Sequence, residues 1–199
     1  MKRRSRSGTA CAARPRACLR ICLLALAVSA ALLVGCGSDE GLAEISYSVE
    51  GRGASARLWI PVNEARSIGT YRGVLRWDSG ETTEITSERE GMVTGVWLED
   101  LTGDENPELI VAMSSAGSGS YGGVDVYGKT SGGLDRLFLA SLGADQREGY
   151  MGHDTFNVED GTLVRSFPVY LADDPNAEPT GGTALWEYSF REGRWVQRR

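Results

Sequence analysis

The sequence predicts an all-β domain, either an antiparallel β-sandwich or a pair of curved sheets, and three observations support this fold class. Apolar and polar residues alternate within short segments. Turn residues separate these segments at intervals of about 8–12 residues. No amphipathic helix of ordinary length stands out. We therefore expect a single domain at residues 44–199, preceded by an N-terminal segment of different character.

The predicted strands follow one another along this domain. Residues 71–77, for example, alternate apolar with polar side chains, and the Asp78-Ser79-Gly80 that follows is typical of a turn. Residues 134–139 form either a strand or a short helix, because so brief an apolar run does not define its period. The predicted strands are residues 45–49, 56–60, 71–77, 93–98, 109–113, 124–127, 154–158, 162–167, 184–190 and 195–197.

The first 35 residues are typical of a secretory signal peptide. Residues 1–20 carry seven basic residues and no acid, and residues 21–34 are apolar or small throughout. This run of 14 residues is too short to span a bilayer, which needs about 20. Residues 1–35 are therefore expected to be removed and to take no part in the fold.

Leu33-Val34-Gly35-Cys36 ends this region and resembles the bacterial lipobox, in which the cysteine is lipidated and becomes the first mature residue. The resemblance implies a membrane anchor through lipid on Cys36 and a tether over residues 36–43. Gly37, in place of an aspartate, implies sorting to the outer membrane, with the domain in the periplasm. Because all four cysteines lie at or before Cys36, the domain contains no disulfide and no thiolate metal ligand.

The mature chain is strongly acidic. After Cys36 there are 14 basic and 27 acidic residues, a formal charge of −13, although the whole chain carries only −6. Such a surface disfavours nucleic acid as a partner and favours a basic protein, mainly through the rate of encounter. The solubility of an exported domain explains the charge equally well.

Residues 114–123 form a glycine- and serine-rich stretch between the predicted strands 109–113 and 124–127. It contains Ser118-Gly119-Ser120-Tyr121. Small residues let a backbone approach another molecule closely, and a single tyrosine supplies an anchor. We therefore interpret the stretch as a projection that binds in a partner's cleft.

A second loop, residues 100–108, resembles the acidic loop of calcium-binding propeller repeats. Asp100, Asp104 and Glu108 could direct oxygens at one hard cation. The motif occurs once and lacks a bidentate closing residue, so a hairpin turn in which Asp and Asn bond their own backbone is favoured. A calcium- or glycan-binding surface lipoprotein that uses this loop is the alternative function.

His153 is the only histidine of the chain. A hydrolase with Ser114, Ser115 or Ser118 as nucleophile is conceivable, but no Gly-x-Ser-x-Gly nucleophile elbow surrounds these serines. We therefore expect no enzymatic activity and no cofactor. His153 is expected to be held by hydrogen bonds near Asp154.

The domain resembles the periplasmic inhibitors of invertebrate-type (i-type) lysozyme. The segments that carry the resemblance are residues 65–71, 100–121, 152–156, 163–170 and 176–182, of which the last two are the more distinctive. Inhibitors of this group carry a Ser-Gly-x-Tyr type loop that enters the lysozyme cleft, and Ser118-Gly119-Ser120-Tyr121 matches its shorter form. The resemblance implies a proteinaceous inhibitor that blocks host lysozyme as a competitive plug.

The resemblance also implies a role for each part of the surface. Ser118 bonds to the catalytic carboxyl groups of lysozyme, and Tyr121 fills the neighbouring sugar subsite. Residues 172–182 are a candidate second contact or, slightly favoured, a solvated connection. The acidic residues of this candidate contact are Asp173, Asp174 and Glu178. An uncovered sheet edge allows a homodimer, as in related inhibitors.

Overall fold

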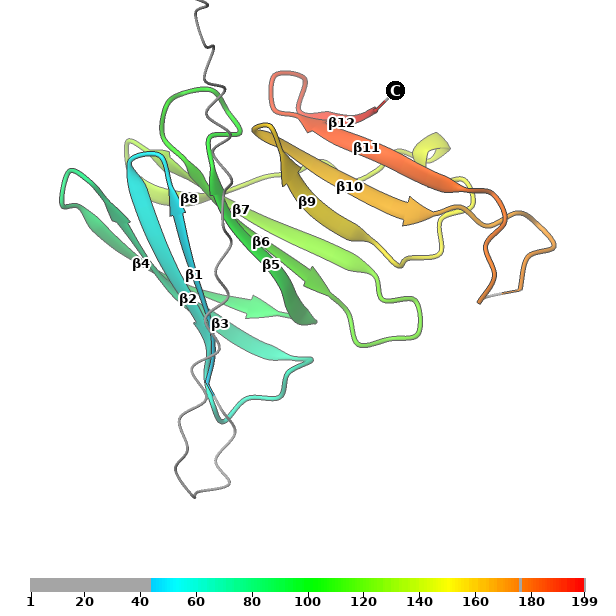
Figure 1. Cartoon of the computed structure of the whole chain (residues 1–199), viewed down its shortest axis with the longest axis horizontal. Coiled ribbons are helices and arrows are strands. Elements are labelled where there is room, and N and C mark those ends of the chain that lie inside the picture. The colour runs from blue at the N-terminus through cyan, green and yellow to red at the C-terminus, as the bar shows by residue number, and fades with distance from the viewer. Residues whose placement is uncertain (1–43, 176, 199) are drawn as a thin grey trace, which may run out of the picture. The chain divides into compact units, whose positions relative to one another are not determined.

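Three four-stranded antiparallel sheets form the part of the chain that the structure describes (Figure 1). This computed structural model describes residues 44–175 and 177–198. The signal peptide predicted at residues 1–35 and the lipidated cysteine and tether predicted at residues 36–43 lie outside them. Within the described ranges, no helix has the length and apolar character needed to cross a membrane.

Each sheet is a series of hairpins, because strands that are consecutive in sequence pair side by side. The first sheet comprises β1 (Ile45–Gly51), β2 (Ala54–Ile60), β3 (Gly69–Trp77) and β4 (Thr82–Arg89). The central sheet comprises β5 (Met92–Glu99), β6 (Glu108–Ser114), β7 (Gly122–Thr130) and β8 (Gly133–Leu137). The third sheet comprises β9 (Thr155–Glu159), β10 (Thr162–Pro168), β11 (Thr183–Ser189) and β12 (Arg194–Gln197). A short 3-10 helix, η1 (Asp145–Arg147), lies between β8 and β9.

The all-β antiparallel fold predicted from the sequence is confirmed, with one sheet more than the expected pair. Residues 134–139 fall mostly in a strand, β8, and not in a helix. Strand β4 was not among the predicted strands, because Ile85 is its only buried apolar residue in a run of threonine, serine and charged residues. The β-branched residues of β4, which favour strands, were the available signal.

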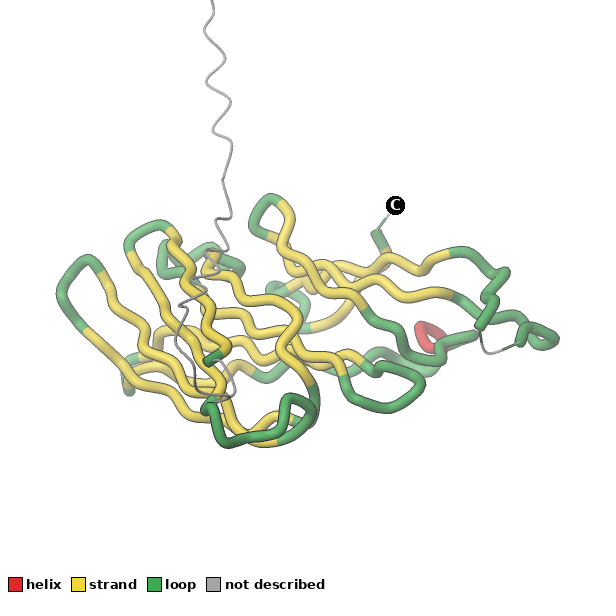
Figure 2. Tube along the Cα trace, turned by 60° about the horizontal axis from the view of Figure 1, so that its bottom comes forward, coloured by secondary structure: helices red, strands yellow, loops and turns green. Residues whose placement is uncertain are grey.

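The central sheet is covered on both faces. Along β6, Leu109 and Val111 pack into a core shared with the first sheet, whereas Ile110 and Ala112 pack into a second core shared with the third sheet. The tube in Figure 2 follows the strands of these layers and the loops that connect them. A strand covered on both faces needs an apolar side chain at every position, which explains the unbroken apolar run of residues 109–113. Strand β6 therefore gives a rigid support to the loop at each of its ends.

A buried polar network links the first sheet to the central sheet. The Tyr71 hydroxyl on β3 donates to Asp125 Oδ2 at 2.6 Å and lies 2.7 Å from the Tyr127 hydroxyl. Arg136 on β8 forms an ion pair with the other oxygen of Asp125. Burial raises the pKa of Tyr71, so this phenol stays protonated and remains a donor. Because these buried groups are paired, the network fixes β3, β7 and β8 relative to one another without leaving a polar atom unsatisfied.

Candidate functional site

The connection between β6 and β7 projects from one end of the central sheet, at the lower right in Figure 1. We call residues 115–121 of this connection the finger. Ala116, Gly117 and Ser118 at its tip are exposed, and the side chain of Tyr121 has a relative exposure of 52%. Among the described residues, the Ser118 hydroxyl has no hydrogen-bond partner. The finger therefore offers a free hydroxyl and an aromatic ring to another molecule.

The finger is closed by its own hydrogen bonds at the stem and at the tip. At the stem, Ser115 N–H donates to the Tyr121 carbonyl at 2.9 Å, and Tyr121 N–H donates to Ser115 Oγ at 2.9 Å. At the tip, Ser120 N–H donates to the Gly117 carbonyl at 2.9 Å, which closes a tight turn. Ser120 takes a positive φ of 42°, a left-handed conformation that few non-glycine residues adopt. The tip is thus a defined turn.

A second segment, residues 149–154, lies against the finger. His153 N–H donates to the Gly119 carbonyl at 2.7 Å, and Gly122 N–H donates to Asp154 Oδ2 at 2.8 Å. Gly152 has φ +95°, and a Cβ added there would lie 1.9 Å from the Gly119 carbonyl oxygen. Glycine is therefore required at position 152 both for its backbone conformation and for this close approach.

Aromatic and charged side chains complete the contact between the two segments. The Tyr121 ring meets the Tyr150 ring edge to face, with centroids 5.7 Å apart. The Tyr150 hydroxyl donates to Asp154 Oδ2 at 2.6 Å, and Arg165 on β10 donates from Nε to Asp154 Oδ1 at 2.7 Å. Burial and the hydrogen bond to Asp154 raise the pKa of Tyr150 to about 12, so it is a hydrogen-bond donor at neutral pH.

Asp154 and Arg165 form the most enclosed ion pair of this region. The Asp154 side chain is 0% exposed and the Arg165 side chain 12%. Arg165 also donates from Nη2 to the Tyr150 hydroxyl at 3.0 Å and lies over the rings of Tyr150 and Phe156. His153 was predicted to lie near Asp154, but the role of Arg165 was not predicted. A lone arginine among apolar residues in the predicted strand 162–167 was the signal available for it.

The acidic loop lies at the other end of β6, at the top of Figure 1. Asp100 Oδ1 accepts from the N–H groups of Gly103 and Asp104, and its Oδ2 accepts from the N–H of Glu105. The buried Glu108 accepts from the N–H groups of Leu101 and Thr102. These carboxylates thus face backbone donors, as the hairpin-turn interpretation requires. Within the part of the chain that the structure describes, no group of three His, Cys, Asp or Glu residues could hold a metal ion.

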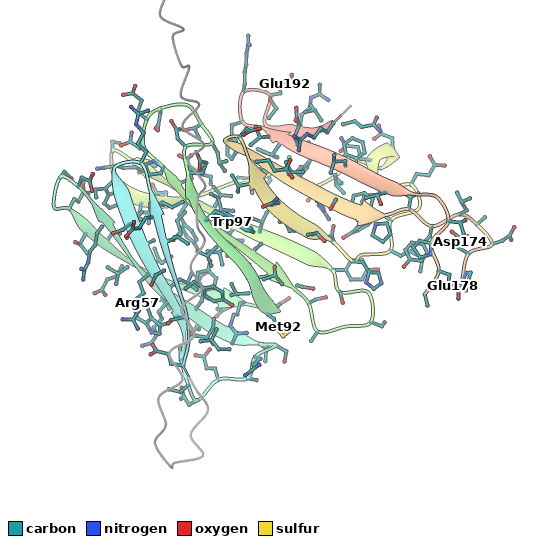
Figure 3. All side chains as sticks on the ribbon, viewed as in Figure 1. Arg57, Met92, Trp97, Asp174, Glu178 and Glu192 are labelled. Carbon is teal, nitrogen blue, oxygen red and sulfur yellow. The ribbon has the colours of Figure 1, made fainter. Side chains whose placement is uncertain are left out.

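The candidate second contact lies at the end of the third sheet, where Figure 3 labels Asp174 and Glu178. Asp174 Oδ2 accepts from the N–H groups of Leu171 and Thr180, and Oδ1 accepts from the Thr180 hydroxyl at 2.7 Å. The Thr180 hydroxyl and the two N–H groups lower the pKa of Asp174. Asp174 therefore closes its own loop, whereas Asp173 and Glu178 are more available to a partner.

In the described residues, His153 is not joined to any of the three serines considered as nucleophiles. The side chain of His153 is exposed, and in the described residues no hydrogen bond joins its imidazole to Ser114, Ser115 or Ser118. Its backbone takes a φ of +58°, and its backbone N–H donates to the Gly119 carbonyl of the finger. The hydrogen bond predicted for His153 is thus made by its backbone N–H.

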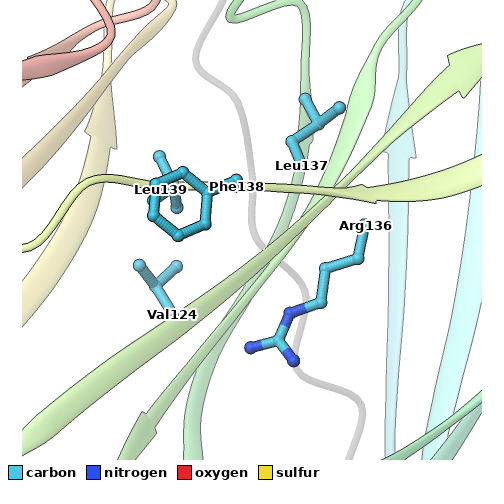
Figure 4. Close-up of a pocket in the computed structure, with 5 residues that line it drawn as sticks. All are labelled: Val124, Arg136, Leu137, Phe138 and Leu139. Atoms are coloured by element: carbon cyan, nitrogen blue, oxygen red, sulfur yellow. The ribbon is translucent and has the colours of Figure 1, made fainter.

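A groove of about 340 Å³ is lined by residues of β7 and β8 and by the two residues after β8, none of which belongs to the finger. Val124 and Leu137 supply apolar lining, and Phe138 is 88% exposed beside them (Figure 4). Arg136, also at the groove, is committed to its ion pair with Asp125. Phe138 is thus an exposed aromatic residue outside the finger.

Comparison with known families matches residues 57–148 to the family described as periplasmic lysozyme inhibitor of I-type lysozyme. The match includes the acidic loop and the finger. It ends before residues 149–154 and before the third sheet, so the segments 152–156, 163–170 and 176–182 lie outside it. A search of curated proteins gives no match.

The solved structures that resemble this chain include two of Aeromonas hydrophila inhibitors. The periplasmic lysozyme inhibitor of I-type lysozyme from Aeromonas hydrophila is 29% identical, with 46% of this chain and 84% of that chain covered and a TM-score of 0.40. An Aeromonas hydrophila inhibitor in complex with Meretrix lusoria lysozyme is 30% identical, with 47% and 80% covered and a TM-score of 0.38. Since the identity reaches 30% over 80% of a solved inhibitor and the family model spans the finger, the chain belongs to the family of periplasmic lysozyme inhibitors of I-type lysozyme.

Proposed function

We propose that this protein inhibits an I-type lysozyme by inserting the finger into the active-site cleft, where it competes with the glycan substrate. The observation that carries the proposal is the exposed tip, in which Ser118 and Tyr121 face outward from a closed turn. Membership of the inhibitor family supports the choice of partner. The protein needs no cofactor and no reaction of its own for this role.

Ser118 suits the chemistry of a lysozyme cleft. Such a cleft holds one carboxylic acid that is kept protonated and one ionised carboxylate. A serine hydroxyl can donate to the ionised group and accept from the protonated one. Because the Ser118 hydroxyl has no partner to give up within the described part of the chain, its bonds to the cleft replace only bonds to water.

Tyr121 provides the larger contact. Its edge-to-face contact with Tyr150 limits the motion of the ring, so little side-chain entropy is lost on binding. The exposed part of the ring and the phenolic hydroxyl then suit a sugar subsite, which offers apolar faces and polar edges.

The finger alone does not account for tight binding. A hydrogen bond to a charged group contributes about 1.5–3 kcal/mol, whereas nanomolar affinity requires about 12 kcal/mol. The remainder needs a surface of roughly 800 Å² on each partner. Met92 and Met151 are exposed apolar residues beside the finger, Met92 pairing with Ser114 at its base and Met151 preceding Gly152. Figure 3 labels Met92 at this end of the central sheet.

Inhibition assays on four variants of the soluble domain test the proposal. Tyr121→Ala should weaken inhibition about 30-fold or more, and Ser118→Ala about tenfold. The matched controls are Phe138→Ala, an exposed aromatic residue at the β8 groove, and Ser131→Ala, an exposed serine in the β7–β8 turn. Neither control should change inhibition, and raising the substrate concentration should relieve inhibition by the wild type. Full inhibition by both finger variants would exclude the plug.

The acidic residues supply a second part of the proposal. The charge of −13 after Cys36 speeds the encounter with a basic lysozyme, so association should slow as salt rises. Asp173 and Glu178 extend this field to the end of the third sheet. Reversing both, in Asp173→Lys with Glu178→Lys, should slow association and leave dissociation nearly unchanged; an unaltered association rate would remove this loop from the interface.

We further propose that lipid on Cys36 holds the inhibitor at the outer membrane, on its periplasmic side. The proposal rests on the sequence around Cys36, because residues 1–43 are outside the described ranges. Labelled fatty acid should enter the wild-type protein and not Cys36→Ala, which should fractionate as a free periplasmic protein. Membrane fractionation of Cys36→Ala equal to that of the wild type would contradict the anchor.

A further inference from the structure

The finger has few contacts of its own beyond the hydrogen bonds at its stem and tip. It is rich in glycine and serine, and two side-chain hydrogen bonds support its stem: Tyr121 N–H donates to Ser115 Oγ at 2.9 Å, and Ser114 Oγ donates to the Ser120 carbonyl at 3.4 Å. Glycine-rich loops lose much conformational entropy when they are ordered. A finger that is flexible before binding would have to lose that entropy on entering a cleft, which lowers affinity.

Further contacts come from residues 149–154 together with Arg165, which we call the brace. The brace is fastened to the third sheet by an isolated bridge between Tyr150 and Val169 and by a hydrogen bond from Tyr170 N–H to the Gly149 carbonyl at 2.9 Å. It then makes three separate contacts with the finger and with Gly122, the residue that follows it. These are the hydrogen bonds His153–Gly119 and Asp154–Gly122 and the ring contact Tyr150–Tyr121.

Asp154 is the centre of the brace. Its carboxylate accepts from Gly122 N–H at the base of the finger, from Tyr150 and from Arg165, and its side chain is completely buried. Charge-assisted hydrogen bonds of this kind are stronger and more directional than neutral ones. A buried carboxylate with three donors from three segments therefore holds those segments in one geometry.

We infer that Asp154, oriented by Arg165, is a positioning residue that keeps the finger in its binding-competent conformation. The third sheet, which lies beyond the residues matched to the inhibitor family, thereby stiffens the finger from outside. This inference rests on the proposed function for its biological meaning, but the ordering of the finger can be measured without lysozyme.

Amide hydrogen exchange on the free domain tests the brace directly. In Asp154→Asn, exchange at Ser115, Ser120 and His153, whose N–H groups do not bond to Asp154, should become about tenfold faster. Exchange along β6 should stay unchanged, as should all exchange in the control Glu84→Gln, an exposed carboxylate on β4. Unchanged exchange at the three finger and brace amides would overturn the inference. Tyr150→Phe, which removes one donor and keeps the ring, gives the same test in a milder form should Asp154→Asn fold poorly.

A pair of glycine substitutions tests the brace by a second route. Gly152→Ala places a Cβ against the Gly119 carbonyl, whereas Gly80→Ala has a similar φ of +88° and no neighbouring atom within 4 Å. Both variants carry the backbone strain of a positive φ, and only Gly152→Ala displaces the finger. Faster finger exchange in Gly152→Ala than in Gly80→Ala supports the brace, and equal exchange in the two contradicts it.

Binding kinetics then separate positioning from a general loss of structure. If the brace holds the finger in its binding-competent conformation, Asp154→Asn should lower the population of that conformation roughly tenfold. Association with lysozyme should then slow by about the same factor, with a smaller change in dissociation. A tenfold change confined to dissociation would instead make Asp154 part of the contact surface and would overturn a positioning role. Should lysozyme not bind even the wild type, the proposed function fails while the exchange experiments still decide the brace.

Discussion

The two loops at the ends of β6 are both held closed by hydrogen bonds, but the acceptors come from different parts of the chain. Both loops adjoin β6, a strand that is buried on both faces, and both are closed by hydrogen bonds from backbone N–H groups. The acidic loop uses carboxylates of its own, Asp100 and Glu108. The finger relies on Asp154, which accepts from the N–H of Gly122 at the base of the finger, 32 residues away in the sequence. A loop closed by its own side chains has few polar groups left for a partner, whereas a loop held from outside keeps its tip free.

The largest expected effect is on the acidic loop. Glu108→Ala should lower the free energy of unfolding by about 2–4 kcal/mol, because two part-buried N–H groups lose their acceptor and a cavity remains. Chemical denaturation measures this change. Each folded molecule of Glu108→Ala should still inhibit lysozyme as well as a wild-type molecule does, because the acidic loop and the finger are at opposite ends of β6. Weaker inhibition per folded molecule would mean that the two loops are coupled.

A matched pair of substitutions compares how each loop is closed. Asp100→Ala removes the acceptor of three N–H groups and should cost about 1 kcal/mol, as loss of a helix cap does. Ser115→Ala removes the acceptor of one N–H in the finger and should cost less than about 0.5 kcal/mol, because the brace still holds the loop. Equal costs, measured by denaturation of both variants, would show that the finger depends on its own side chains as much as the acidic loop does.

The buried Glu108 should make stability depend on pH. Burial raises its pKa above 4.5, its ordinary value, although the two N–H donors oppose the shift. A raised carboxyl pKa means that the folded state binds the proton more tightly, so its contribution to stability is complete below the unfolded pKa and is lost as pH rises through the folded pKa. Glu108→Gln should therefore flatten the stability profile above about pH 4.5. A profile identical to that of the wild type would contradict the shift.

Calcium should have the smallest effect. The oxygens of Asp100 already accept from three N–H groups, so a cation would have to replace three hydrogen bonds to bind there. Thermal melting with millimolar calcium should match melting with a chelator, within about 0.3 kcal/mol. A larger stabilisation that disappears in Asp104→Ala would favour the alternative of a calcium-binding lipoprotein.

The parts of this comparison that the sequence predicted are those set by local patterns. The apolar run 109–113 and the glycine- and serine-rich stretch after it predicted a strand and an exposed loop, and the Asp100–Asn106 pattern predicted a self-bonded turn. The brace was not predictable in this way, because Asp154, Arg165 and Gly122 meet only through the packing of the third sheet on the central sheet. Strand β4 was missed for the opposite reason, since it has little apolar pattern to detect.

Because the finger is closed at its stem, along one side and through the backbone of its tip, the side chains of its outermost residues have no part in holding its shape. Ala116, Gly117 and Ser118 contribute no side chain to the hydrogen bonds that shape the loop within the described structure. These three positions can therefore accept other small or polar residues at little cost in folding. Selection by a changing enzyme target can act on them one residue at a time, and the same freedom makes the domain a scaffold on which new cleft-binding sequences can be displayed.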